Sequence, residues 1–367
     1  MGAGKKKVLI LCPSPRGTAA TQRLKYEQYL DALEKEGYQF TISSFQTKRF
    51  WDIVYKPGRT MEKIGWTAIG YLRRLGDLLR SPFYDGVFVN LWVTPLGFPL
   101  FERLLFLFNK NVIYDIDDMI FITRYDHLKT GFVQRLKGRK KPMVMMKNAK
   151  YVIVCTPKLE EIAASLNKDK RVVDISSTFD TERFVPVMKY EQKNPLTIGW
   201  TGTHSTLPFL ESLQPVLAAV SRQRPVKLLV IANKEYKMKD VPTEFIQWTA
   251  EREVEDLHQF DIGLYPIPAN EWSLGKSSLK ALTYMAIAIP FVATAYGTNY
   301  RIMQQGVQGF LATSEQEWIS SLLQLIDDPG LRKRMGQAGR KTVEELFSLQ
   351  ANFPKYLHVF KTVIPTN

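Results

Sequence analysis

Residues 271–294 read EWSLGKSSLKALTYMAIAIPFVAT, which indicates a loop, a helix and a buried strand in direct succession. Gly275 lets a ligand approach the backbone of the loop, and Ser277 and Ser278 can cap the helix or donate hydrogen bonds. Apolar side chains recur at helical spacing along 279–286 and would hold the helix on a core. The stretch therefore predicts a helix that begins at an accessible loop and leads into a buried strand.

The start of this helix is a candidate phosphate site. A helix N-terminus carries backbone N–H groups without intrahelical partners and the positive end of the helix dipole, and both favour an anion. Lys276 and Lys280 add positive charge at the same place. The alternative is an ordinary capped helix that follows a turn, and the stretch by itself fits both interpretations.

Strand-like runs alternate with helical segments along the rest of the chain, which argues for parallel α/β sheets. The chain starts with a predicted strand at 6–12, a loop at 13–20 and one helix at 21–36. Further strands are predicted at 38–43, 84–92, 111–116, 151–156, 171–176, 196–201, 226–231, 245–249, 260–265 and 289–294, and helices from 316 to 363. Both halves are interpreted as doubly wound, with a linker near 186–195.

Small and polar loops follow several of these predicted strands. Because ligands bind at the carboxyl ends of the strands in open α/β sheets, the loops form the candidate site. The loop residues are Arg16, Gly17, Asp115, Asp117 and Asp118 in the first half, and Gly202, Thr203 and His204 in the second.

The length of 367 residues suits two domains, which we place at 1–187 and 188–350, with a C-terminal helix at 351–367. The composition is ordinary for a globular protein, and no apolar run approaches the roughly 18 residues that span a membrane. Residues 1–12 do not have the architecture of a signal peptide. Cys12 and Cys155 lie in apolar runs and are expected to be buried thiols, which fits a cytoplasmic protein.

The formal charge of +14 predicts an anionic partner. Basic residues concentrate at 48–80, where they alternate with aromatic residues, and at 135–150. A helix with basic, aromatic and aliphatic residues suggests contact with an anionic membrane surface. The alternative is a solvated basic helix whose apolar face lies in the core. Nucleic acid is not expected as a partner, because the sequence contains no recognised module for it.

At 260–294 and 297–312 the sequence resembles the nucleotide-sugar segment of GT-B-fold glycosyltransferases, specifically the large retaining family four. Residues 180–186 resemble that family's interdomain junction, and 330–348 followed by 350–364 resemble its closing helices. The resemblance implies an α/β fold of two doubly wound Rossmann-like domains that face each other across a cleft. It also implies a C-terminal helix that returns to the N-terminal domain.

The sequence departs from the pattern of this family around the predicted phosphate site. The family's usual pair of glutamates would fall at Gly275 and Thr283, and the arginine of its Gly-Arg pair would fall at Thr203. Lys276 and Lys280 are our candidates to replace the missing cation, because a departing nucleoside diphosphate needs positive charge nearby. Their Gly-Lys-x-x-x-Lys spacing resembles a subgroup of these transferases.

The family's catalytic histidine would fall at Asp117-Asp118, where a carboxylate can orient or deprotonate an acceptor hydroxyl. A competing interpretation is the metal-binding Asp-x-Asp of GT-A enzymes, formed by Asp115 and Asp117, since paired carboxylates suit a hard cation that carries a diphosphate. Transferases of the resembled kind usually work without a metal, so no metal or other cofactor is expected. Asp118 can also simply cap the following turn.

The resemblance implies a cytoplasmic, membrane-peripheral, retaining glycosyltransferase. It would move a sugar from a nucleotide diphosphate sugar to a hydroxyl of a glycan or polyprenyl-linked acceptor, in the synthesis of cell-surface polysaccharide or glycoconjugate. Asp117 and Lys276 are the predicted catalytic residues, and Asn90, Trp92 and Asp118 are assigned to the acceptor. The predicted donor residues are Arg16, Gly17, Gly202, Thr203, His204, Trp248, Glu271, Gly275, Lys276, Ser277, Ser278, Leu279 and Lys280.

Two of these donor residues carry a specific expectation. Trp248 would stack on the nucleobase, and Glu271 would bind a sugar or ribose hydroxyl.

Two other functions stay open for the same fold. One is a non-catalytic GT-B partner subunit of another glycosyltransferase, because both family glutamates are absent, and the other is a nucleotide-sugar epimerase-like enzyme.

Overall fold

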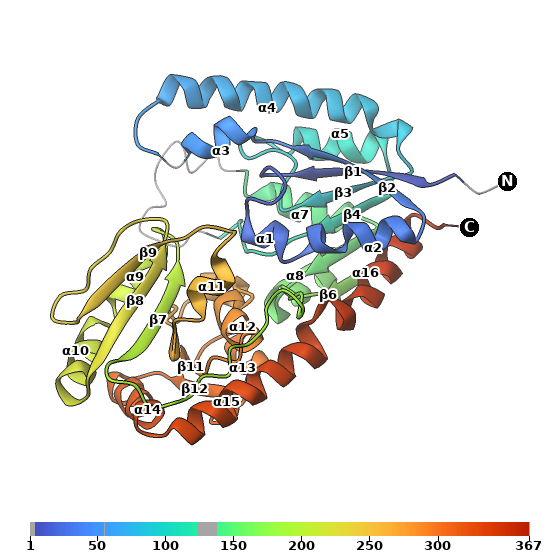
Figure 1. The fold of residues 1–367 in the computed structure, drawn as a ribbon. Coiled ribbons are helices and arrows are strands. Elements are labelled where there is room, and N and C mark those ends of the chain that lie inside the picture. Colours follow the sequence, from blue (N-terminus) through green and yellow to red (C-terminus); the bar gives the residue numbers. More distant parts are fainter. Residues whose placement is uncertain (1–3, 55, 123–137, 367) are drawn as a thin grey trace. The chain divides into compact units, whose positions relative to one another are not determined.

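A computed structural model describes the chain at residues 4–54, 56–122 and 138–366. By its internal contacts the chain divides into two units (Figure 1). Unit 1 comprises Met1–Ser177 and Asn352–Asn367, and unit 2 comprises Thr178–Ala351. Each unit contains a six-stranded parallel sheet with helices packed on it, which confirms the predicted α/β class. Residues 135–137 of the predicted basic cluster at 135–150 lie outside the described residues.

The sheet of unit 1 has the strand order β2-β1-β3-β4-β5-β6. The strands are β1 Lys6–Cys12, β2 Tyr38–Ser44, β3 Gly86–Asn90, β4 Val112–Asp115, β5 Tyr151–Val154 and β6 Val172–Asp174. In β1 the run from Val8 to Cys12 is fully buried, as expected for a parallel strand that is covered on both faces. Because β2 and β3 flank β1 on opposite sides, the connections diverge between β1 and β3.

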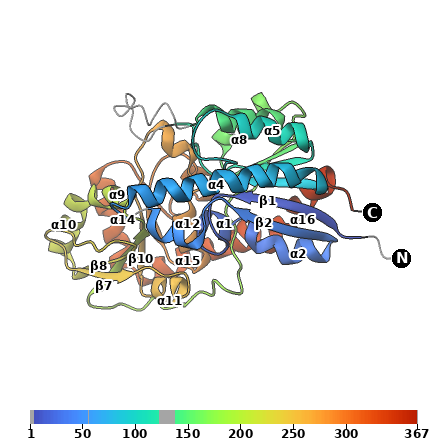
Figure 2. The same cartoon turned by 90° about the horizontal axis from the view of Figure 1, so that it is seen from above.

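The helices of unit 1 cover both faces of this sheet (Figures 1 and 2). They are α1 Ala20–Arg23, η1 Tyr26–Tyr29, α2 Leu30–Lys35, α3 Lys48–Val54, α4 Thr60–Arg80, η2 Ser81–Phe83, α5 Leu100–Phe108, α7 Lys140–Asn148, α8 Pro157–Leu166 and α16 Leu349–Val363. The single helix predicted at 21–36 is wrong, because the chain breaks at Lys25 with φ −125° and ψ −113°. The break directs the Lys25 ammonium into the interior, where it meets Asp115.

The C-terminal helix α16 belongs to the core of unit 1, which confirms the predicted return of this helix to the N-terminal half. Its Tyr356 ring lies 4.3 Å from the ring of Tyr29, and its Phe360 ring stacks 5.9 Å from Phe88 of β3. These aromatic contacts join the two ends of the sequence in one core.

Unit 2 has the strand order β12-β11-β10-β7-β8-β9. The strands are β7 Leu196–Gly202, β8 Val226–Ala232, β9 Thr243–Gln247, β10 Ile262–Tyr265, β11 Phe291–Thr294 and β12 Gly309–Ala312. Strand β12 was not predicted from the sequence. In this order β7 and β10 are neighbours, and the chain leaves them toward opposite edges of the sheet.

The helices of unit 2 are α9 Leu207–Glu211, α10 Gln214–Gln223, α11 Glu253–Leu257, η4 Glu271–Gly275, α12 Leu279–Ala286, α13 Asn299–Ile302, α14 Glu315–Asp327, α15 Pro329–Thr342 and η5 Val343–Phe347. Trp200 on β7 and Trp318 on α14 are among the largest side chains of the core. Among the described residues of both units, no helix is long and apolar enough to cross a membrane.

Glu317 makes the start of α14 sensitive to pH. Its carboxylate accepts hydrogen bonds from the Thr313 hydroxyl and N–H and from the Ser314 N–H, which hold the pKa of Glu317 at about 2, below the ordinary 4.5. Because the folded pKa is the lower one, this stabilisation is present above pH 4.5 and is lost as the pH falls through 2.

The melting temperature of Glu317→Gln should therefore lie below that of the wild type by a constant amount between about pH 7 and 5, and the difference should shrink at lower pH. Thermal unfolding of both proteins over this range measures it. Glu315→Gln, in the same first turn but outside this capping box, is the matched control. A difference that persists unchanged to about pH 2 would contradict the assignment.

Candidate functional site

The strongest candidate site in unit 2 lies where the connections diverge, between β7 and β10. In open parallel sheets this point leaves a crevice at the carboxyl ends of the two strands. The loop after β7 contains Gly202 and Thr203, and the segment after β10 contains η4, Lys276 and the start of α12. The structure therefore brings the two predicted halves of the donor site to one edge of the sheet.

Lys280 places its charge at this point. Its Nζ lies 5.4 Å from the ring centre of Trp200 on β7 and 5.8 Å from that of Tyr265 at the end of β10. The Lys276 Nζ lies 3.9 Å from the ring centre of Trp272 in η4. Such cation–π contacts hold an ammonium group in place while it keeps its charge. Two positioned cations thus lie at the candidate site of unit 2.

The start of α12 adds backbone donors to these cations. Ser278 precedes the helix with φ 59° and ψ 31°, and its side chain does not cap it. The Ser278 hydroxyl instead donates to Asn299 Oδ1 at 2.7 Å. Of the two roles open to this serine, it therefore takes the second and donates a hydrogen bond. Ser278 therefore does not use its side chain on the N–H groups of the first turn, and such groups at a helix start suit an anion.

Tyr284 fixes α12 against both strands of the site. Its hydroxyl donates to the Leu264 carbonyl of β10 at 3.1 Å and accepts from the Thr201 N–H of β7 at 3.3 Å. Gly263 makes room for the ring, since a Cβ there would lie 2.6 Å from Tyr284 Cδ2. Complete burial raises the pKa of Tyr284, so its hydroxyl keeps the proton that it donates. The helix start is thereby held at a defined place beside the crevice.

The loop after β7 forms a compact turn. The Thr203 N–H donates to Thr206 Oγ1 at 3.2 Å, and the His204 N–H donates to Asn233 Oδ1 at 2.7 Å. Gly202 cannot carry a side chain, because a Cβ would lie 2.3 Å from the Trp200 ring. The His204 side chain is exposed, and its Nδ1 lies 3.3 Å from Asn233 Nδ2.

The predicted donor residues Glu271 and Trp248 lie on η4 and directly after β9. Glu271 is exposed at the start of η4, whose Trp272 ring lies 6.0 Å from Phe209 of α9. Trp248 is half-buried after β9, and its N–H donates to the Ala232 carbonyl at the end of β8. Since β8 separates β9 from β7, Trp248 lies at the same edge of the sheet but two strands from Trp200.

The predicted residues of unit 1 also lie at the carboxyl ends of strands. Arg16 is exposed, with its guanidinium 3.9 Å from Asp31. Gly17 has φ +80°, and its N–H donates to Glu27 Oε2 at 2.9 Å. At the end of β3, Asn90 is buried. Two positions further, Trp92 is half-buried with its ring 5.3 Å from Phe45.

The aspartates after β4 differ from one another in their surroundings. Asp115 Oδ1 lies 2.5 Å from Lys25 Nζ, and both side chains are completely buried. Although burial acts to lower it, the Asp115 carboxylate raises the pKa of Lys25 and keeps the ammonium charged. One oxygen of the Asp115 carboxylate is therefore held by Lys25 inside unit 1. Asp117 and Asp118 are half-buried, and among the described residues no three His, Cys, Asp or Glu side chains are grouped for a metal.

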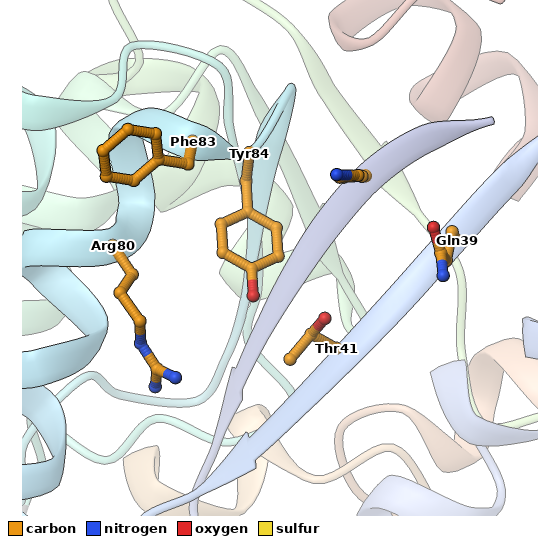
Figure 3. Close-up of a pocket in the computed structure, with 6 residues that line it drawn as sticks. Gln39, Thr41, Arg80, Phe83 and Tyr84 are labelled. Atoms are coloured by element: carbon orange, nitrogen blue, oxygen red, sulfur yellow. The ribbon is translucent and has the colours of Figure 1, made fainter. Parts of the chain in front are cut away.

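Two hollows in the described parts of the chain lie away from these residues. In unit 1, a hollow of about 370 Å³ is lined by Lys7, Gln39, Thr41, Arg80, Phe83 and Tyr84 (Figure 3). Lys7 and Gln39 lie near the amino ends of β1 and β2, at the opposite edge of the sheet from the predicted site. In unit 2, a hollow of about 490 Å³ lies beside α15.

Several residues of the site were not found by the sequence analysis. Lys25, Asn233 and Tyr284 became visible only through partners far away in the chain. Nothing in the local pattern distinguishes a buried lysine or tyrosine with a polar partner from its neighbours on the same helix. Only Gly263, which makes room for Tyr284, leaves a trace in the sequence as a glycine inside a strand.

A comparison with protein-family models matches part of unit 2. Residues 197–328, from β7 through α14, match the family model described as "Glycosyl transferases group 1". The matched segment contains both loops of the candidate site in unit 2. A comparison with curated protein sequences found no match.

Solved structures resemble the chain over nearly its whole length. Sucrose-phosphate synthase from Thermosynechococcus elongatus is 15% identical with a TM-score of 0.68, covering 98% of this chain and 99% of its own. Anabaena HepE in complex with UDP and glucose is 14% identical with a TM-score of 0.65, covering 97% and 100%. A glycosyltransferase from Rickettsia africae is 12% identical with a TM-score of 0.65 and full coverage of both chains, 100% each. The chain thus has the GT-B fold, and with the family-model match this supports a GT-B glycosyltransferase.

Proposed function

We propose that the chain is a retaining glycosyltransferase that moves a sugar from a nucleoside diphosphate sugar to an acceptor hydroxyl. The observation that carries the proposal is the position of the Lys280 ammonium between β7 and β10, beside the start of α12. A diphosphate is the ligand that suits a crevice with two lysines and a helix N-terminus. The family-model match covers the same segment.

The chemistry follows from the charge of the leaving group. As the bond between the sugar and the diphosphate breaks, negative charge grows on the phosphate oxygens, and fixed positive charge lowers the energy of that state. Lys276, Lys280 and the first N–H groups of α12 supply that charge in this proposal. The departing phosphate then accepts the proton of the acceptor hydroxyl on the same face of the sugar, which retains the anomeric configuration.

The proposal assigns the acceptor to unit 1. There the half-buried Asp117 or Asp118 would orient the acceptor hydroxyl, with Asn90 and Trp92 nearby along the sheet edge. A glycan or polyprenyl-linked acceptor in the cytoplasm, in cell-surface polysaccharide or glycoconjugate synthesis, fits the basic surface of the chain. The lysines make a divalent metal unnecessary for charge neutralisation in this scheme.

A non-catalytic GT-B partner subunit is the second candidate. It is favoured by Gly275 and Thr283, which stand where the resembled family has glutamates. Thr283 donates its hydroxyl to the Leu279 carbonyl of its own helix at 2.8 Å, so it offers no substitute acid there. A partner subunit would retain the fold without turning over a nucleotide sugar.

Nucleoside diphosphates are expected to stabilise the purified chain. A ligand at about 100 times its Kd adds about 2.7 kcal/mol, which corresponds to about 5–10 °C in the melting temperature of a unit of this size. A thermal-shift screen of UDP, GDP, ADP and their sugars, with the nucleoside monophosphates as controls, measures it. The β-phosphate should account for most of the shift. No shift with any diphosphate would contradict the proposal, and binding without turnover would favour the partner subunit.

A further inference from the structure

Helix α4 turns its apolar side chains outward. Met61, Leu72 and Leu79 are 80%, 69% and 59% exposed, and Ile64, Ile69 and Leu75 are exposed as well. Figures 1 and 2 show α4 as a long helix on the outside of unit 1, over one face of its sheet. We call the side chains of Met61, Ile64, Ile69, Leu72, Leu75 and Leu79 the apolar strip. A surface helix of a globular protein normally buries such a stripe.

The strip is continuous along the helix. Positions 61, 64, 68, 72, 75 and 79 follow each other at spacings of three and four, so they lie on one face, and Ile69 lies beside that face, three residues before Leu72. Gly65 and Ala68 lie on the same exposed face, which carries no charged side chain between Met61 and Leu79. At 1.5 Å per residue, the 21 residues of α4 extend over about 30 Å.

The inward face of α4 carries a buried ion pair. Arg74 and Asp77 are completely buried, and their side chains pair at 3.0 Å. Arg74 also donates to the carbonyl of Cys12 at 2.7 Å and to that of Val93 at 2.9 Å. These bonds fix the rotation of the helix about its axis. Because Arg74 and Asp77 point inward, the apolar strip on the other side of the helix faces outward. The alternative that this helix buries its apolar face in the core is therefore wrong.

The neighbouring helix α5 continues the apolar surface. Leu100 and Leu107 on α5 are 59% and 72% exposed, and Phe98 just before it is 87% exposed. The two helices contact each other through Tyr71 and Phe101, whose rings lie 5.5 Å apart. Exposed apolar surface on this scale in a folded unit marks an interaction site.

The basic residues near the apolar strip favour an anionic partner. Residues 48–80 contain eight basic and three acidic residues, and Lys56, Arg59 and Arg80 are exposed near the two ends of α4. The whole chain carries a formal charge of +14, so a second copy of it would bring like charge against this face. An anionic phospholipid surface offers both an apolar layer and complementary charge.

We propose that α4 lies in the interface of an anionic membrane, with the apolar strip at the acyl boundary and the flanking basic residues among the headgroups. The inference deepens the proposed function, because it locates the surface by which unit 1 would reach a polyprenyl-linked acceptor. It does not depend on sugar transfer, since vesicle binding and nucleotide binding are measured separately.

Vesicle co-sedimentation tests the proposal. The wild type is expected to bind phosphatidylglycerol-containing vesicles, to bind phosphatidylcholine vesicles weakly, and to lose affinity at high salt. Leu72→Glu with Leu79→Glu should weaken binding to the anionic vesicles at least about 10-fold. The matched control is Leu346→Glu in unit 2, where the leucine is 58% exposed, close to the 59% of Leu79. Equal loss in the control, or no binding by the wild type, would overturn the proposal.

A fluorescent label reports insertion without relying on charged variants. Cys12 and Cys155 are completely buried, and burial raises the pKa of Cys12 to about 11, so a thiol reagent should react with an introduced Leu75→Cys alone. When anionic vesicles are added, the emission maximum of an environment-sensitive label at position 75 is expected to shift to shorter wavelength. The emission of the same label at Leu346→Cys is expected not to shift. A blue shift that depends on protein concentration instead of lipid would show self-association and overturn the membrane assignment.

The nucleotide screen distinguishes this proposal from the proposed function. If the variants with glutamate on α4 keep the thermal shift with nucleoside diphosphates but lose vesicle binding, both proposals stand. If the wild type binds vesicles but no nucleotide, only the proposed function fails.

Discussion

Lys280→Met is expected to lower the turnover of a nucleotide sugar about 10²–10³-fold, with the fold of unit 2 unchanged. Methionine keeps an apolar stem that packs on the rings of Trp200 and Tyr265, and it removes only the ammonium that lies beside them. That ammonium is proposed to act on the charge that develops on the leaving diphosphate. Its loss should therefore reduce kcat more than it raises KM.

The release of nucleoside diphosphate by the purified chain measures the effect of Lys280→Met. Lys276→Met is expected to act in the same direction, because the Lys276 ammonium lies over Trp272 in the adjoining turn. Lys341→Met is the matched control, since Lys341 on α15 has a side chain that is 75% exposed and is far along the chain from the loops of the site. Wild-type turnover in Lys280→Met would remove the basis of the donor assignment.

Arg74→Met is expected to lower the free energy of unfolding of unit 1 by about 3–5 kcal/mol. The substitution removes the completely buried guanidinium that pairs with the buried Asp77 carboxylate at 3.0 Å, and leaves that carboxylate only its contact with the exposed Arg80 at 2.7 Å and its bond from the Ser43 hydroxyl. It also removes one of the two donors to the buried carbonyl of Cys12, which keeps the bond from the Phe45 N–H. Arg73→Met, which removes one bond to the Ser44 carbonyl from a half-buried side chain, should cost about 1 kcal/mol.

Thiol reactivity provides a readout that is specific to unit 1. Both cysteines, Cys12 and Cys155, belong to this unit and are buried, so their reaction with a thiol reagent in increasing urea follows its opening. Arg74→Met with Asp77→Leu should recover part of the loss, because removing both partners leaves no unpaired buried charge. Equal costs for Arg74→Met and Arg73→Met would contradict the role given to this ion pair.

Much of the fold could be predicted because buried parallel strands have a strong local signal. The run from Val8 to Cys12 is apolar throughout and fully buried, and the predicted strand at 6–12 coincides with β1. The start of α12 was found because Gly275 and the serines interrupt two apolar segments. Interruptions of this kind are set by neighbouring residues, so the sequence shows them directly.

Features that depend on distant partners could not be predicted. The chain breaks at Lys25 because its ammonium pairs with Asp115, which is 90 positions away in the sequence. The outward rotation of α4 follows from Arg74, whose acceptors are on other elements. The basic, aromatic and aliphatic residues at 48–80 suggested a helix at a membrane surface, but that composition alone does not say which face of the helix is buried. The position of Lys280 likewise depends on distant residues, because its ammonium lies near Trp200 and Tyr265 only when β7 pairs with β10.

Tyr284 has a consequence for the thermodynamics of binding. Its buried hydroxyl ties α12 to Leu264 on one strand and to Thr201 on the other, so the helix start has lost its freedom before any ligand arrives. A phosphate that binds there would not have to order a flexible loop, and more of the contact energy would remain as affinity. Calorimetry of nucleotide binding should accordingly show a small entropic penalty, which Tyr284→Phe would enlarge.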